Sequence, residues 1–308
     1  MKIGVTLGDP TGIGPEIILK GISQINNNKN LVIFGNKNIL KKTAGDLRLL
    51  KKYHKIKNAV VDCVNNIKFQ YGRPTKATGQ IAIQSIDSAL KNNVDILITA
   101  PIVKEVIRYT IPGFSGHTEY FAKFFRIKKI AMVGLWRTKR IMLLTTHLPL
   151  LNVFREITKD HVLQKIILLE QGLKKYFGIN KPSIGVSALN PHSFEFSLGE
   201  DEKIRKGVET AQKNNINVTG PYPTDSLFNR DFDGYLTMYH DQAMIYLKSK
   251  SNGLNFTLGL PIIRLSPLYG AALDIAGKNV AHVSGFIAAI NRGVKIFKNV
   301  RKHEKNKS

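Results

Sequence analysis

"KIGVTLGDPTGIGPE", residues 2–16, holds the local pattern on which the predicted fold depends. Residues 2–8 form an apolar run of strand length, three glycines punctuate the next stretch, and Pro15 suits the first position of a helix. A strand that passes through a tight turn into a helix is the start of an α/β chain. The glycine spacing matches neither the dinucleotide fingerprint nor the P-loop, so this turn alone predicts no ligand.

Apolar runs of strand length alternate with helical patterns along the rest of the chain. Strands are predicted at 31–35, 94–102, 183–189 and 234–240, a hairpin at 130–136 and 140–147, and helices at 79–92, 158–177, 199–215 and 283–299. Thr118 is expected to cap a further helix, and the basic tail 301–308 is expected to be disordered. This alternation predicts the α/β class with a mixed, mostly parallel sheet.

Size and composition bound the class of protein. A chain of 308 residues with 43% hydrophobic residues can bury a substantial core in one large domain or two ordinary ones. No apolar run reaches the length of about 18 residues that a membrane span needs, and the N-terminus does not resemble a signal peptide. The single cysteine, Cys63, fits a reducing compartment, so a cytoplasmic location is expected.

The formal net charge of +24 raises the question of nucleic acid. The basic residues are spread through lysine- and asparagine-rich stretches, and we find no basic helix with interleaved aromatics and no zinc-finger spacing. We therefore expect no specific nucleic-acid partner and no membrane partner. A basic binding protein without catalytic activity remains the alternative from another functional class.

Three histidines follow the ends of three predicted strands. His147 ends one apolar run, His192 lies just beyond the next, and His240 ends a third. Because the carboxyl ends of strands in an open α/β sheet line one crevice, these imidazoles can converge on one ion. For any one of them alone, a hydrogen-bonded loop histidine is the better interpretation. Asp241 and Asp225 lie in the same regions and could orient an imidazole or accept a proton.

Other segments suit an anion. Gly116, His117 and Thr118 lie at a predicted helix start, where backbone N–H groups favour phosphate or carboxylate. Arg264 is flanked by apolar residues in a segment that also contains Asn255, and an arginine in that setting needs an anionic partner.

Taken together, the motifs resemble those of the 4-hydroxythreonine-4-phosphate dehydrogenase family, which acts in pyridoxal phosphate biosynthesis. They occur in family order: "GDPTGIGPE", "TAPIVKE", "GFSGHTEYF", "TTHLPL", "LNPH", "GPYPTDSLF", "MYHDQ", "GLNFTLGLPIIRLSP" and "DIAGK". The resemblance implies a two-domain fold similar to isocitrate and isopropylmalate dehydrogenases. It places both termini and the nucleotide in a domain of residues 1–115 and 262–308, and metal, substrate and dimer contacts in residues 116–261. It also implies a homodimer with its active site at the subunit interface.

Site residues carried over from the family fall on the positions already singled out. The implied ligands of one divalent metal (zinc, magnesium or cobalt) are His147, His192 and His240. The implied substrate-binding residues are His117, Thr118, Lys248, Asn255 and Arg264. Tyr269, Gly270 and Asp274 lie in the loop that contacts the nucleotide in related dehydrogenases. In that loop Tyr269, Gly270 and Ala271 stand where the family has His-Gly-Thr, and "SFEFSLGEDE" after His192 is bulkier than the usual glycine-rich stretch.

The implied reaction uses NAD or NADP to oxidise the secondary alcohol of 4-phosphohydroxy-L-threonine. Decarboxylation then yields 3-amino-2-oxopropyl phosphate. Asp241 or Asp225 is expected to take the hydroxyl proton. A sister dehydrogenase that acts on threonate or erythronate 4-phosphate is the nearest alternative, because it would share the metal, the fold and the cofactor.

Overall fold

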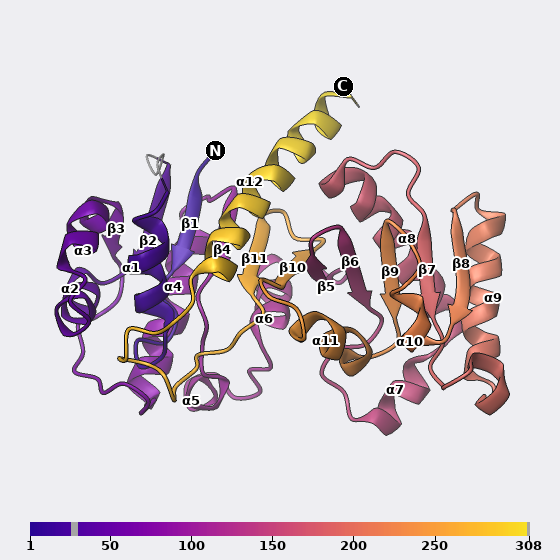
Figure 1. Cartoon of the computed structure of the whole chain (residues 1–308), viewed down its shortest axis with the longest axis horizontal. Coiled ribbons are helices and arrows are strands. Elements are labelled where there is room, and N and C mark those ends of the chain that lie inside the picture. Colours follow the sequence, from indigo (N-terminus) through magenta and orange to yellow (C-terminus); the bar gives the residue numbers. More distant parts are fainter. Residues whose placement is uncertain (26–29, 307–308) are drawn as a thin grey trace. The chain divides into compact units, whose positions relative to one another are not determined.

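The structure, a computed structural model, describes residues 1–25 and 30–306, and its internal contacts divide the chain into two compact units. Unit 1 comprises Met1–Phe125 and Leu260–Val294, and unit 2 comprises Arg126–Gly259 and Lys295–Ser308. Figure 1 shows the elements of each unit. The division of roles between the two predicted domains stays a prediction.

Unit 1 is built on parallel strands in the order β3 (Val60–Asp62), β2 (Leu31–Gly35), β1 (Ile3–Thr6), β4 (Ile96–Thr99) and β11 (Ile263–Pro267). Its helices are α1 (Gly14–Ile22), α2 (Lys37–Asp46), α3 (Leu50–Ile56), α4 (Lys76–Lys91), α5 (Lys104–Arg108) and α6 (His117–Phe125), with the 3₁₀ turn η1 (Lys57–Ala59). Val5, Ile33 and Ile98 are fully buried in the strands and Ile17 and Ile86 in the helices, so both layers contribute to one apolar core.

The predicted strand–turn–helix unit forms as β1, the turn and α1, and its turn packs against the loop that follows β11. The Ile13 N–H donates to the Ala271 carbonyl at 2.9 Å. A Cβ added to Gly12 would lie 2.6 Å from that same carbonyl oxygen, so only glycine permits the approach. Asp9 is fully buried, its carboxylate accepts from Thr11 and Thr78, and burial raises the pKa of Asp9. The turn is therefore a support for the loop after β11.

Unit 2 contains a mixed sheet in the order β10 (Leu254–Leu258), β5 (Ala131–Trp136), β6 (Lys139–Leu143), β9 (Gly234–Thr237), β7 (Ile184–Ser187) and β8 (Val218–Tyr222). The strands β6, β9, β7 and β8 run parallel to one another, whereas β5 is antiparallel to both β6 and β10. The predicted α/β class with a mixed, mostly parallel sheet and a hairpin is confirmed.

The helices of unit 2 begin and end where the sequence provides caps. They are α7 (Leu150–Glu156), α8 (Lys159–Phe177), α9 (Glu200–Lys213), α10 (Thr224–Leu227) and α11 (His240–Lys248), with the 3₁₀ turn η2 (Ser193–Phe196). The Thr158 hydroxyl accepts from the His161 N–H at the start of α8, and Gly178 ends that helix in the left-handed region with φ 68°.

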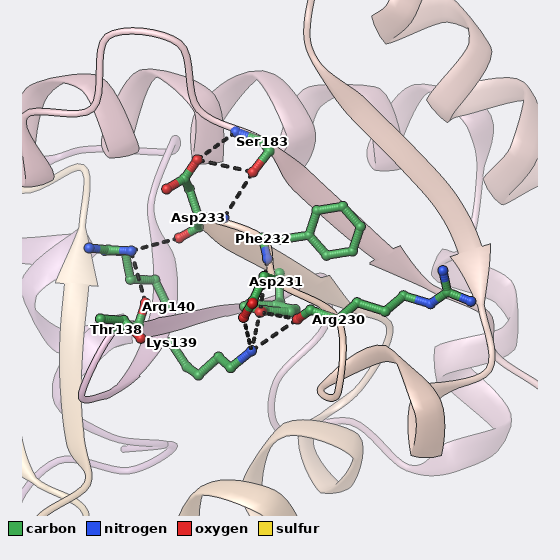
Figure 2. Close-up of polar contacts among 9 residues, drawn as sticks. Thr138, Lys139, Arg140, Ser183, Arg230, Asp231, Phe232 and Asp233 are labelled. Atoms are coloured by element: carbon green, nitrogen blue, oxygen red, sulfur yellow. Dashed lines mark hydrogen bonds and ion pairs between the residues drawn. The ribbon is translucent and has the colours of Figure 1, made fainter.

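A polar cluster anchors the starts of β6 and β9, and Figure 2 shows its members. The Lys139 ammonium donates to the Arg230 carbonyl at 3.0 Å and to the buried Tyr235 hydroxyl. Arg140 donates to the Asp233 carbonyl at 2.9 Å, and the Asp233 carboxylate accepts from the N–H and hydroxyl of Ser183. The beginnings of β6, β9 and β7 are thereby held together at the end of the sheet opposite their carboxyl ends.

Two local predictions are corrected. Helix α6 already begins at His117, so Thr118 lies inside the helix and is not its cap. Helix α12 runs from Ser284 to Lys305, so the tail is helical and not disordered as far as Lys305; residues 307–308 lie outside the described part. Lysine, arginine and glutamate are good helix formers, and Arg301 pairs with Glu304 at 3.9 Å, which explains the longer helix. No helix within the described residues is long and apolar enough to cross a bilayer.

Candidate active site

The carboxyl ends of the parallel strands of unit 2 meet at one edge of the sheet. His147 follows β6, His240 follows β9, His192 follows β7 and Asp225 follows β8. Because β6 and β9 are adjacent and β9 and β7 are adjacent, the predicted ligands come from neighbouring strands. This is the edge at which open α/β sheets bind ligands.

His147 and His240 lie side by side at this edge. Their ring centroids are 6.0 Å apart, and they line a cavity of about 330 Å³ together with Thr146, Leu148, Leu150, Tyr239 and Asp241. Two imidazoles on one tetrahedral zinc, with Zn–N bonds of about 2.0 Å, place their centroids roughly 5 Å apart. The observed pair is therefore within a small side-chain adjustment of that spacing.

The Asp241 carboxylate is hydrogen-bonded to the ring of His240. The distance between His240 Nδ1 and Asp241 Oδ1 is 2.7 Å, and His240 is the first residue of α11. A carboxylate on Nδ1 fixes the orientation of an imidazole and directs its Nε2 outward, as in many metal sites.

His192 is not brought to this pair within the chain. Its backbone is left-handed with φ 55°, its side chain is 71% exposed, and its Nδ1 lies 3.9 Å from Glu195 Oε2. Within the described residues, no group of at least three His, Cys, Asp or Glu side chains is close enough to hold a metal ion. The chain alone therefore joins two of the predicted metal ligands and leaves the third on an exposed turn.

The other predicted residues of unit 2 lie farther from the histidine pair. Asp225 is exposed in α10, and β8 lies two strands from β9, roughly 10 Å away. Lys248 is the last residue of α11, about 12 Å along the helix from His240. Asn255, the second residue of β10, pairs with Gly134, which pairs in turn with Ile141 in the middle of β6, and its Oδ1 is buried.

Arg264 lies in unit 1 on β11 and is 1% exposed. Its Nη2 donates to the Thr99 hydroxyl at 2.6 Å, and its guanidinium carbon lies 5.5 Å from the centroid of the Phe121 ring. Burial lowers the pKa of Arg264 to about 9, and the nearby Glu119 carboxylate opposes that shift. At neutral pH the guanidinium stays charged in a site that favours an anion.

His117 adds to this cationic region at the first position of α6. Burial lowers its pKa well below the usual value, and the charges of Arg264 and Lys104 act in the same direction. The imidazole is therefore neutral near pH 7, and its buried Nε2 has no hydrogen-bond partner among the described residues. The Lys104 ammonium also lies at the helix start that carries Thr118. A Cβ added to Gly116 would lie 3.4 Å from Lys104 Nζ. The structure thus brings His117, Arg264 and Lys104 close together, with Thr118 next to His117 in the first turn of α6.

The predicted nucleotide loop follows β11. The Tyr269 side chain packs on the start of α12, because a Cβ added to Gly285 would lie 2.9 Å from its ring. Gly270 and Asp274 are exposed, and a Cβ added to Gly270 would meet nothing within 4 Å. Open space beside an exposed backbone suits the approach of a ligand.

Gln242 is the residue of this edge to which sequence reasoning gave no role. Its side chain bonds to both the β9–α11 turn and the segment after β7. Its position directly after His240 and Asp241 was a signal that it belongs to the same site. Its partners could not be predicted, because they depend on the order of the strands in the sheet.

Known proteins resemble this chain over nearly its whole length. Residues 27–292 match the family described as pyridoxal phosphate biosynthetic protein PdxA. Proteins named 4-hydroxythreonine-4-phosphate dehydrogenase are 37% identical in Sulfurihydrogenibium sp. (98% of this chain, 100% of the relative) and 36% identical in Aquifex aeolicus (94% and 96%). The crystal structure of 4-hydroxythreonine-4-phosphate dehydrogenase from Klebsiella pneumoniae superposes with a TM-score of 0.78 at 26% identity, covering 96% of this chain and 99% of that one.

The chain agrees with these proteins in both sequence and fold over nearly its whole length, and this agreement identifies its family. The chain belongs to the PdxA family of pyridoxal phosphate biosynthetic proteins.

Proposed function

We propose that this chain is a dehydrogenase that oxidises the secondary alcohol of 4-phosphohydroxy-L-threonine with NAD or NADP. The oxidation gives a β-keto acid, which loses carbon dioxide readily because the ketone stabilises the developing carbanion, and leaves 3-amino-2-oxopropyl phosphate. The observation that carries this proposal is the His147–His240 pair beside a cavity, in a chain whose relatives bear the name of that enzyme.

The proposed ligands of the divalent metal are His147, His192 and His240. Imidazole nitrogens suit zinc or cobalt better than magnesium, which prefers oxygen ligands, so the donor set fits the first two metals. When bound, such a metal would acidify the substrate hydroxyl, and the nicotinamide would accept the hydride. Asp241 orients His240 through the 2.7 Å contact. Asp241 and Asp225 are the proposed proton acceptors, and Asp241 is the nearer of the two to the pair.

The proposed anion-binding residues hold the two ends of the substrate. The buried guanidinium of Arg264, with the neutral imidazole of His117 and the hydroxyl of Thr118, makes a site in unit 1 that suits a phosphate or a carboxylate. Lys248 and Asn255 are further proposed substrate-binding residues. Fixing both anionic groups would orient the reacting carbon toward the nicotinamide, for which Tyr269, Gly270 and Asp274 are the proposed contacts.

The proposed assembly is a homodimer with its active site at the subunit interface. Large apolar side chains are exposed directly after two of the histidines: Leu148, Leu150, Leu151, Phe194, Phe196 and Leu198. An apolar surface of this kind beside a functional site is typical of a protein interface. In such a dimer a second copy can complete the metal site, which accounts for the separation of His192 from the other two histidines in one chain.

Mixed dimers test the shared site. If ligands to one ion come from both chains, His192→Ala and His240→Ala, each inactive alone, should regain activity after they are unfolded together and refolded. Random pairing makes half of the dimers mixed, and each mixed dimer has one intact site of two, so about a quarter of wild-type activity is expected. Activity of the mixture at the level of the separate variants would show that His192 and His240 act from one chain.

The substrate assignment is tested with the full chain, zinc or cobalt, and NAD. We expect NADH formation from 4-phosphohydroxythreonine with a kcat/KM about 100-fold above that for threonate 4-phosphate, because a site that pairs with an amine rejects a hydroxyl in its place. Comparable or better turnover of threonate or erythronate 4-phosphate would instead identify the sister dehydrogenase.

A further inference from the structure

The side chain of Gln242 joins two strand ends of unit 2. Its Oε1 accepts from the Met238 N–H at 2.8 Å and from the Ser187 hydroxyl at 3.1 Å. Its Nε2 donates to the Ala188 carbonyl at 2.9 Å and to the Leu189 carbonyl at 3.4 Å. A primary amide has two donors and an acceptor oxygen with two lone pairs, so this one is fully used.

The partners of Gln242 lie two residues before His240 and three to five residues before His192. Met238 ends the approach to His240, and Gln242 itself lies in the first turn of α11, which His240 begins. Ser187 is the last residue of β7, and Ala188 and Leu189 lead into the segment that carries His192. One amide therefore links the backbone that leads to His240 with the backbone that leads to His192, beyond the last β7–β9 pair of Val186 and Leu236.

The segment before His192 is held from its other side as well. The Leu189 N–H donates to Asp201 Oδ1 at 2.9 Å, and the Asn190 side-chain amide donates to Asp201 Oδ2 at 3.2 Å. Asp201 is fully buried at the start of α9. Hydrogen bonds therefore hold the backbone in place as far as Asn190. The exposed turn that starts at His192 follows closely after this held segment.

We propose that Gln242 is a positioning residue of the metal site, which sets where the segments bearing His240 and His192 leave the sheet edge. The inference rests on the proposed function, because it requires these histidines to bind a divalent metal. Metal–nitrogen bonds tolerate displacements of only a few tenths of an ångström, so a shift between the two segments weakens binding. When a second copy supplies His192, the same displacement moves ligands at both sites of the dimer, because each chain then contributes to two ions.

The test compares Gln242→Ala and Gln242→Glu with Gln212→Ala. Glutamate keeps the size of the side chain but sets a carboxylate oxygen against the Ala188 and Leu189 carbonyls. Gln212 is a matched control in the same unit, because its Nε2 also donates to a backbone carbonyl, that of Val218 at 2.8 Å, away from the histidines. Co²⁺ affinity is measured on each full-length variant by absorption titration against a competing chelator, and thermal unfolding is measured without metal.

Both Gln242 variants should bind Co²⁺ about 10- to 100-fold more weakly than wild type, with an altered visible spectrum, whereas Gln212→Ala should bind it normally. A purely structural role predicts a lower melting temperature for all variants and unchanged metal affinity in those that fold. Affinities for both Gln242 variants within about threefold of wild type would overturn the inference and leave the proposed function intact. A wild-type protein that binds no Co²⁺ would overturn the metal site and this inference together. If Gln242→Ala does not fold, the glutamate variant decides.

Discussion

Replacing His240 with alanine should lower kcat by at least about 1000-fold, because the variant loses a proposed metal ligand, the imidazole that Asp241 orients. The His240 side chain is 32% exposed and starts a helix, so the free energy of unfolding should change by no more than about 1 kcal/mol. Steady-state NADH formation and the metal content of the purified protein measure the first effect, and denaturant unfolding measures the second.

His161, a histidine of unit 2 outside the proposed site, provides the control for this experiment. His161 lies on α8, where its Nδ1 contacts the Glu156 carbonyl at 3.0 Å, and it does not line the cavity of the histidine pair. His161→Ala should therefore retain wild-type activity and metal content. Full activity of His240→Ala after removal of bound metal would eliminate the metal from the mechanism.

Replacing Arg264 should weaken substrate binding more than any other change in the anion site. Arg264→Lys keeps the charge but loses the forked pair of donors, so KM should rise by about 10- to 100-fold. Arg264→Met also removes the charge beside Glu119 and the bond to Thr99, so we expect a larger rise in KM and a stability loss of about 3 kcal/mol. Initial rates over a range of substrate concentration and competition by inorganic phosphate measure the binding effect.

Arg108 is a suitable structural control, because its Nε donates to the Phe114 carbonyl at 3.0 Å in the same unit. Arg108→Met should alter stability modestly and leave KM unchanged. A folded Arg264→Met protein with wild-type KM and phosphate inhibition would refute the assignment of Arg264 to the substrate.

Local signals in the sequence predicted much of the fold. Thr158 and Gly178 marked the ends of α8, because a side-chain cap and a left-handed glycine act within one turn of the helix. The hairpin of β5 and β6 and the turn after β1 were predicted for the same reason. The helical course of residues 240–248 was not predicted, because its apolar residues also fit the continuation of a buried strand.

The candidate site could be predicted only in part, because the order of strands is not a local property. His147 and His240 are far apart in the sequence and meet because β6 pairs with β9, whereas His192 remains apart on its exposed turn. The resemblance supplied the residue types of the site. It could not supply the contacts of Gln242 or the closeness of Lys104 to Gly116, which depend on packing between distant segments.

The polar cluster of Lys139, Arg140 and Asp233 has a consequence for protein engineering. Its hydrogen bonds hold the N-terminal ends of β6, β9 and β7 together. The histidines and the exposed apolar residues occupy the turns at the carboxyl ends of these strands. Mutations in those turns therefore leave the hydrogen bonds of the polar cluster intact. New substrate preferences can evolve there without a matching loss of stability in the sheet.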